Sequence, residues 1–201
     1  MCKLGPMTAE SFRQHTRALL RARLVDAALA QAATTPWEKV RMSDVAADVG
    51  VSRQTVYNEF GSKDALAQSA LMRVLTAFLD GIRDSLDAHE EFGDAIEAAL
   101  GWTLRNGRGH PVIQRVLADA EHGRSSLLLN LLTIQSEAII QPASAFVRDY
   151  VDRRWPERLS ADGPALVDAL VRLILSHILR PQADLDAAAA SLATIINRAT
   201  A

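Results

Sequence analysis

Apolar residues recur three and four positions apart along most of the chain, with polar residues between them. Leu20, Leu24 and Ala27 show this spacing near the start. Leu192 and Ile196 show it near the end. The spacing matches one face of an α-helix, and no stretch of any length alternates apolar and polar residues as a strand does. The pattern therefore predicts an all-α protein.

Glycine and proline residues divide this pattern into separate helices, because both disfavour the interior of a helix. Pro142 lies inside a pattern that continues from residue 124 to 155 and predicts one long helix, kinked near Ala138. The expected helices run from between Thr8 and Thr16 to about residue 33, and then over 43–50, 52–60, 62–89, 92–108, 111–120, 124–155, 160–180 and 184–200.

Two short helices are expected on either side of a tight turn at Gly50. The hydroxyls of Ser43 and Ser52 can cap the first and second helix, since each can accept from an unpaired backbone N–H. Gly50 supplies the left-handed conformation that ends a helix at little cost. Val56 and Phe60 give the second helix an apolar side for packing. Two helices joined in this way form a helix-turn-helix.

The second of these helices carries a polar face opposite its apolar pair. Gln54 and Asn58 lie four residues apart on this face, and such amides can pair bidentately with adenine. Arg53 at the helix start can pair with guanine in the same way. The hydroxyls of Thr55 and Tyr57, on the flanks, can reach phosphates. The face therefore indicates sequence-specific DNA binding; the alternative is an ordinary solvated face on a short amphipathic helix.

The stretch 51–66, Val-Ser-Arg-Gln-Thr-Val-Tyr-Asn-Glu-Phe-Gly-Ser-Lys-Asp-Ala-Leu, closely resembles the signature of the tetracycline-repressor (TetR) family. Segments 23–29 and 43–50 resemble the same family, so the resemblance covers about residues 17–70. Gln54 departs from it, since many members carry glycine or a small residue there. This departure concerns the operator sequence and not the fold.

The resemblance implies an N-terminal three-helix helix-turn-helix DNA-binding domain over residues 1–64. It also implies a C-terminal helical ligand-binding and dimerisation domain over residues 65–201. In that family the position of Lys63, at the start of the connecting helix, faces a DNA phosphate. The residues expected at the DNA are Ser43, Ser52, Arg53, Gln54, Thr55, Tyr57, Asn58 and Lys63.

The distribution of charge matters more for DNA binding than the net charge of −2. Residues 1–64 hold nine Lys and Arg and seven Asp and Glu, whereas residues 65–201 hold thirteen and seventeen. This asymmetry is modest and gives DNA binding weak support by itself. The N-terminal basic residues can reach a phosphate backbone or a minor groove, or form a solvated arm; they are Lys3, Arg13, Arg17, Arg21 and Arg23.

Other classes of protein find little support in the sequence. It contains no Gly-x-Ser-x-Gly elbow, no phosphate-binding glycine loop and no His-Glu-x-x-His pair. The five histidines show no metal-ligand spacing, so we expect no enzyme, no metal and no cofactor. Cys2 is the one cysteine, which favours a reducing cytoplasm. No signal peptide and no apolar run as long as a membrane span is expected.

The last two expected helices have broad apolar faces that suit either a core within the chain or a dimer interface. Dimeric helix-turn-helix proteins read two half-sites related by twofold symmetry, and the TetR family dimerises through these two helices. We therefore expect a homodimer. The residues expected in its interface are Leu170, Ile174, Ile178, Leu192 and Ile195.

The middle helices, from about residue 70 to 155, enclose a small-molecule pocket in the TetR family. The resemblance thus predicts a repressor that binds a palindromic operator and is released by a small, largely apolar effector. The alternative is a helix-turn-helix regulator that acts through a protein partner without such a ligand. Candidate lining residues are Phe78, Trp102, Arg105, Leu128, Ile134, Gln135, Ile139, Phe146 and His177.

Overall fold

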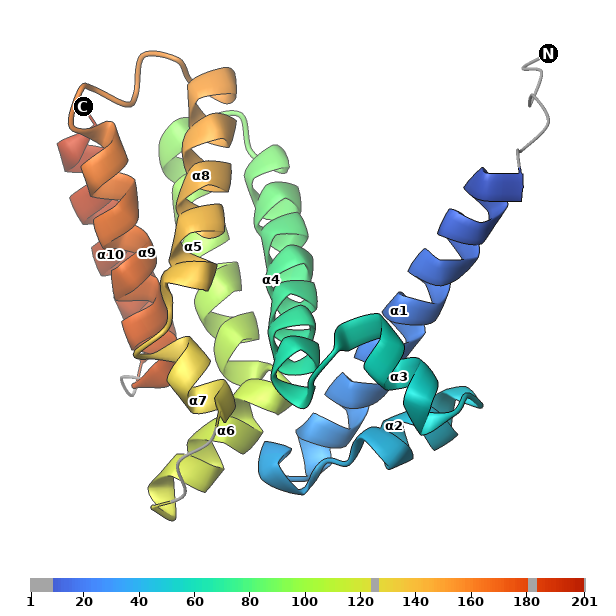
Figure 1. Cartoon of the computed structure of the whole chain (residues 1–201). Helices are drawn as coiled ribbons and strands as arrows, with labels where there is room; N and C mark the ends of the chain where they lie inside the picture. The colour runs from blue at the N-terminus through green and yellow to red at the C-terminus, as the bar shows by residue number, and fades with distance from the viewer. Residues whose placement is uncertain (1–8, 124–126, 181–183, 201) are drawn as a thin grey trace.

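The computed structural model describes residues 9–123, 127–180 and 184–200, and within these ranges it is helical without strands (Figure 1). The prediction of an all-α fold is therefore confirmed. The elements are α1 (Ala9–Thr34), the short 3-10 helix η1 (Trp37–Lys39), α2 (Met42–Val49), α3 (Arg53–Phe60), α4 (Lys63–Asp87), α5 (Phe92–Gly109), α6 (Pro111–Glu121), α7 (Leu127–Leu132), α8 (Glu137–Arg154), α9 (Gly163–Leu179) and α10 (Leu185–Ala199).

The helices α1, α2 and α3 pack around an apolar core at the N-terminal end of the chain. Leu24 of α1, Val45 of α2 and Val56 of α3 have no exposed surface. Trp37 of η1 is buried in the same core. The first half of α1 lies outside this core: every side chain from position 10 to 19 is exposed, and Figure 1 shows this half standing out from the rest of the molecule.

The ends of α2 and α3 follow the local signals in the sequence, with one exception. Gly50 ends α2 in the left-handed conformation at φ 77°, and the hydroxyl of Ser52 caps α3 by accepting a backbone N–H at 3.1 Å. The predicted cap at Ser43 is wrong. Because α2 begins at Met42, Ser43 lies within its first turn, where its hydroxyl donates to Asp44 Oδ1 at 3.1 Å.

The 25-residue helix α4 connects the helix-turn-helix to the second part of the chain (Figure 1). By length and composition it could cross a membrane, but Leu66 and Leu71 are buried in the core and Ile82 lines an apolar cavity between helices. α5 packs against both α4 and α10, and α8 packs against α9. α6 lies on α1 and α7 contacts η1, so the second part of the chain rests directly on the N-terminal helices.

The prediction of one helix from residue 124 to 155 is wrong. α7 ends at Leu132 and α8 begins at Glu137. The carbonyl of Asn130 accepts from the backbone N–H groups of Thr133 and Gln135 at 3.2 and 2.9 Å, which closes α7 and interrupts the helical ladder. Pro142 lies inside α8, which continues past it to Arg154. The turn that separates the two helices comes from the rearranged bonding at Asn130.

Candidate functional site

The polar face of α3 is ordered by hydrogen bonds between its own side chains. Gln54 Nε2 donates to Asn58 Oδ1 at 2.9 Å, and both residues are exposed. The guanidinium of Arg53 lies 5.2 Å from the ring centroid of Tyr57, and its Nη2 is 3.4 Å from the phenol oxygen. Two amides and one cation therefore stand side by side, prearranged on an accessible helix face.

α3 has one acidic residue, Glu59, and α1 pairs with it twice. Arg17 Nε donates to Glu59 at 2.9 Å, and Arg21 Nη1 lies 3.5 Å from the same carboxylate. Arg21 also donates to the backbone carbonyl of Glu59 and lies 4.4 Å from the ring of Phe60. Among the basic residues predicted to reach DNA, these two arginines instead attach α1 to α3, and they neutralise a charge that would repel phosphate. Arg13 and Arg23 are exposed.

Lys63 at the start of α4 turns toward η1. Its ammonium donates to the backbone carbonyl of Glu38 at 3.0 Å and lies 5.5 Å from the ring centroid of Trp37. Burial lowers the pKa of Lys63. On the other side of η1, Glu38 Oε1 accepts from the backbone N–H of Leu127 at 3.3 Å. These contacts tie together the start of α4, η1 and the start of α7.

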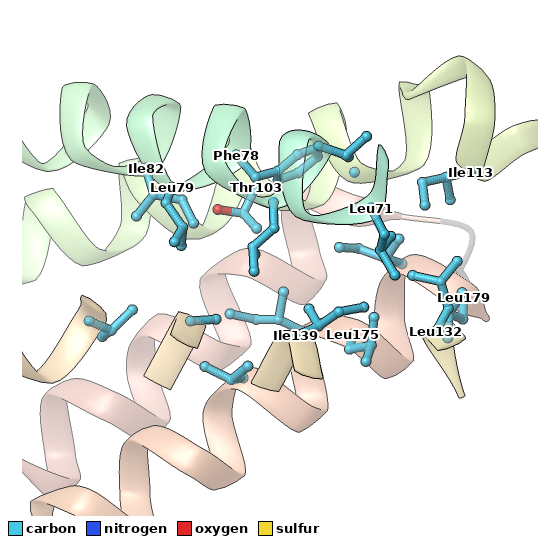
Figure 2. A pocket seen from close by; sticks show the side chains of 18 residues that line it. Leu71, Phe78, Leu79, Ile82, Thr103, Ile113, Leu132, Ile139, Leu175 and Leu179 are labelled. Atoms are coloured by element: carbon cyan, nitrogen blue, oxygen red, sulfur yellow. The ribbon is translucent and has the colours of Figure 1, made fainter. Parts of the chain in front are cut away.

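A cavity of about 120 Å³ lies between α4, α5, α8 and α9, with α6 and α7 at one end (Figure 2). The one side-chain oxygen in its wall belongs to Thr103, and that hydroxyl already donates to the carbonyl of Ala99 at 2.6 Å. The wall is therefore apolar throughout. Its residues are Leu71, Val74, Leu75, Phe78, Leu79, Ile82, Thr103, Gly107, Ile113, Leu132, Ile139, Ala143, Val147, Val171, Ile174, Leu175, Ile178 and Leu179.

Two family models match the chain. One, described as bacterial regulatory proteins of the tetR family, matches residues 24–70, and the other, described as the C-terminal domain of the bacterial tetracycline repressor, matches residues 91–198. The HTH-type transcriptional regulator AlkX of Mycobacterium tuberculosis is 34% identical over 188 residues, which cover 92% of this chain and 88% of that protein. The chain belongs to the TetR family.

Solved structures of TetR-family proteins share its fold. The repressor AlkX of Dietzia sp. strain DQ12-45-1b is 27% identical with a TM-score of 0.73, covering 89% of this chain and 93% of that one. RolR in complex with resorcinol has a TM-score of 0.62 at 14% identity, covering 90% and 89%, and supports the fold alone. As a TetR-family member the protein is a DNA-binding transcriptional regulator of the helix-turn-helix type, and its family consists of regulators, not enzymes.

The predicted ligand residues of this TetR-family protein divide between several places. Phe78 and Ile139 line the apolar cavity. Phe78 also lines a second, more open pocket of about 370 Å³ with Trp102 and Arg105. Leu128 lines a third, much smaller cavity. The remaining four line none of these pockets: Ile134 and Gln135 are exposed, Phe146 packs in the C-terminal core, and His177 is half-buried.

Sequence reasoning missed three polar residues, Thr103, Asn106 and His110, and most of the aliphatic wall. His110 lines the open pocket, its ring centroid is 6.2 Å from that of Phe78, and its Nδ1 is buried with no hydrogen-bond partner among the described residues. Burial lowers the pKa of His110. The aliphatic wall of the apolar cavity had a usable signal, because Leu71, Leu75 and Ile82 follow one stripe of α4.

The predicted dimer face needs correction. Leu170 and Leu192 are buried in the core of their own chain, and Ile174 and Ile178 line the apolar cavity. These four side chains therefore face inward, because α9 and α10 turn their most apolar stripes toward α5 and α8. Ile195 points outward and is 56% exposed.

Proposed function

We propose that the protein is a homodimeric repressor that binds a palindromic operator through α3 and leaves it when a hydrocarbon chain fills the apolar cavity. The functional boundary lies near residue 64, and the protein acts in the cytoplasm. The observation that carries the proposal is a cavity with an apolar wall, enclosed by helices that also contact the DNA-binding part.

At the operator, the side chains of Arg53, Gln54 and Asn58 read base edges in the major groove. All three are exposed, Gln54 is bonded to Asn58, and Arg53 is held by Tyr57. This arrangement supports the role, since amides pair with adenine and guanidinium with guanine. The hydroxyl and ammonium groups around them fix the register by contacting phosphates. These groups belong to Ser43, Ser52, Thr55, Tyr57 and Lys63.

A palindrome requires two copies of α3 related by twofold symmetry. Support for a dimer through α9 and α10 comes from two exposed large apolar residues, Leu173 of α9 at 47% exposure and Ile195 of α10 at 56%. Ser191 and Ala199 lie one turn before and one turn after Ile195 on the exposed face of α10, with Arg198 beside them. We therefore assign the dimer interface to this outer face and not to the inward-facing stripe that periodicity alone suggested.

The shape and wall of the cavity define the class of effector. Along α4 it extends from Leu71 to Ile82, and eleven residues of helix span about 16 Å. A narrow apolar space of this length suits an unbranched hydrocarbon chain. The AlkX repressor of Dietzia is implicated in the biodegradation of n-alkanes, which agrees with this class.

A ligand in the cavity can affect the position of the DNA-binding part through α6. Ile113 of α6 lines the cavity, and Val112 and Val116 of the same helix join the core shared with α1. α5 leads into α6 and packs closely against α9. At Gly107 of α5 there is no room for a side chain, because a Cβ there would lie 2.5 Å from Cδ1 of Ile178. A ligand that favours one spacing of these helices shifts the population between the DNA-bound and released states.

The test combines footprinting and ligand titration. The protein is bound to DNA from upstream of its own gene, and we expect a protected palindrome whose affinity falls with salt. Adding decane should lower the affinity about 5–150-fold, the usual range of allosteric coupling. A palindrome that is protected equally with and without every hydrocarbon tested contradicts the effector and favours control by a protein partner.

A further inference from the structure

A second cavity of about 10 Å³ lies where the apolar cavity meets the DNA-binding part. Leu71, Ile113 and Leu132 line both spaces, and Figure 2 places these three at the end of the larger cavity opposite Ile82. The volume is about that of a single water-sized group. The small cavity is therefore an end chamber for a molecule that lies along α4.

The end chamber contains one polar side chain. Trp37 of η1 forms part of its wall, and the other nine residues around it are aliphatic. Trp37 is 3% exposed, and its indole N–H is buried with no acceptor among the described residues. Buried donors are nearly always paired. A water there is poorly held, because a buried water needs two to four polar partners.

We infer that the end chamber receives the oxygen atom of a neutral, singly oxygenated hydrocarbon, a primary alcohol or an aldehyde, which accepts the hydrogen bond of Trp37 Nε1. The inference rests on the proposed function, since the hydrocarbon chain occupies the larger cavity. An oxidised alkane is then a stronger effector than the alkane itself, because an alkane leaves the indole N–H unpaired.

The walls of the two cavities argue against a carboxylate. An ionised group buried in apolar surroundings needs a charged partner, and the residues that line the two spaces include none. The ammonium of Lys63 lies over the ring of Trp37 at 5.5 Å, but it lines neither cavity and donates to the carbonyl of Glu38. A neutral oxygen can accept the one hydrogen bond that Trp37 offers and needs no charged partner.

Trp37 would carry the signal directly, since it belongs to the core that holds α1, α2 and α3 together. Its ring lies beneath Lys63, at the start of α4, and the neighbouring Glu38 holds the start of α7 through Leu127. A hydrogen bond at Trp37 therefore joins the effector to the DNA-binding part, with no helix in between.

The test compares 1-decanol with 1-chlorodecane, which has a similar shape and is a poor hydrogen-bond acceptor. Affinities are measured by displacement of the uncharged dye N-phenyl-1-naphthylamine, in the wild type and in Trp37→Phe. We expect the affinity of 1-decanol relative to 1-chlorodecane to fall about threefold to tenfold in the variant, the factor of one hydrogen bond. Trp155→Phe is the matched control, because that indole donates to the carbonyl of Glu90 at 3.1 Å, outside both cavities.

An unchanged ratio in Trp37→Phe overturns the inference while leaving the apolar ligand in place, whereas failure of both compounds to bind overturns the proposed function itself. Decanoate that binds more tightly than 1-decanol, with the same dependence on Trp37, overturns the neutral class. Should Trp37→Phe fold poorly, the inference is tested in the 15N-labelled wild type, by the NMR chemical shift of the Trp37 indole proton. We expect it to shift downfield with 1-decanol and not with 1-chlorodecane, and equal shifts with both overturn the inference.

Discussion

Replacing Ala143 with leucine introduces an isopropyl group into the apolar cavity. Ala143 lies on α8, is 8% exposed and forms part of the cavity wall. Alanine and leucine both favour helices, so the substitution acts through packing and not through helix propensity. The outcome therefore depends on whether the space beside Ala143 is free.

The expected gain follows from the size of the cavity. At about 24 cal/mol per Å³, a cavity of about 120 Å³ lowers the free energy of unfolding by about 3 kcal/mol. An isopropyl group fills only part of that space, so we expect the variant to be about 1 kcal/mol more stable. The same group obstructs the path of a chain along α4, and we expect the affinity for an apolar dye to fall at least about tenfold.

Urea unfolding at one fixed protein concentration measures the stability, since any dimerisation makes stability depend on concentration. Titration with N-phenyl-1-naphthylamine measures binding. Ala145→Leu is the control: it makes the same substitution on the exposed side of the same helix, and surface changes usually stay within about 0.5 kcal/mol. The reasoning is refuted if Ala143→Leu destabilises by more than about 1 kcal/mol, as in a fully packed core, or leaves dye binding unchanged.

Three further predictions concern the other parts of the molecule. Asn58→Ala should relax the preference at particular operator bases by about 1–3 kcal/mol, measured by anisotropy with single-base operator variants; equal weakening at all bases would contradict base reading. Leu173→Glu combined with Ile195→Glu should give folded monomers in light scattering, because both side chains are exposed; an intact dimer would place the interface elsewhere. Tyr150 donates to Asp87, and burial first and this hydrogen bond second raise its pKa to about 12. Since the raised pKa favours the protonated folded form, the resulting stability is present below about pH 10 and is lost toward pH 12. Urea unfolding across that range should show a smaller loss for Tyr150→Phe than for the wild type.

The helix-turn-helix could be predicted because its signals are local. Gly50 and Ser52 act within a few residues of themselves, and an isolated sequence contains everything that such caps require. The link from Arg17 to Glu59 joins residues 42 positions apart. No period or cap indicates such a pair, and the same arginine reads equally well as a ligand for phosphate until α1 and α3 are placed in space.

The faces of α9 show a second limit. This helix is apolar around most of its circumference, so periodicity identifies two possible contact stripes and cannot assign them to core or partner. The structure assigns Ile174 to the cavity and Leu173, one residue earlier, to the surface. Cavity residues are equally hard to predict, because an empty space and a filled one are lined by the same aliphatic side chains.

We expect the exposed first half of α1 to make operator affinity depend on temperature. The side chains at positions 10–19 are exposed, and the ion pair from Arg17 to Glu59 lies at the surface, where such pairs add little stability. A helix of that length with so little packing is marginal in water. Its helix–coil equilibrium is therefore close to balance, and warming moves it toward coil. A surface that contacts this segment as a helix must supply the entropy of ordering it. Operator occupancy should thus decline on warming more steeply than the stability of the core accounts for. Helix-favouring substitutions on this arm would flatten that decline while every base-reading side chain stays the same.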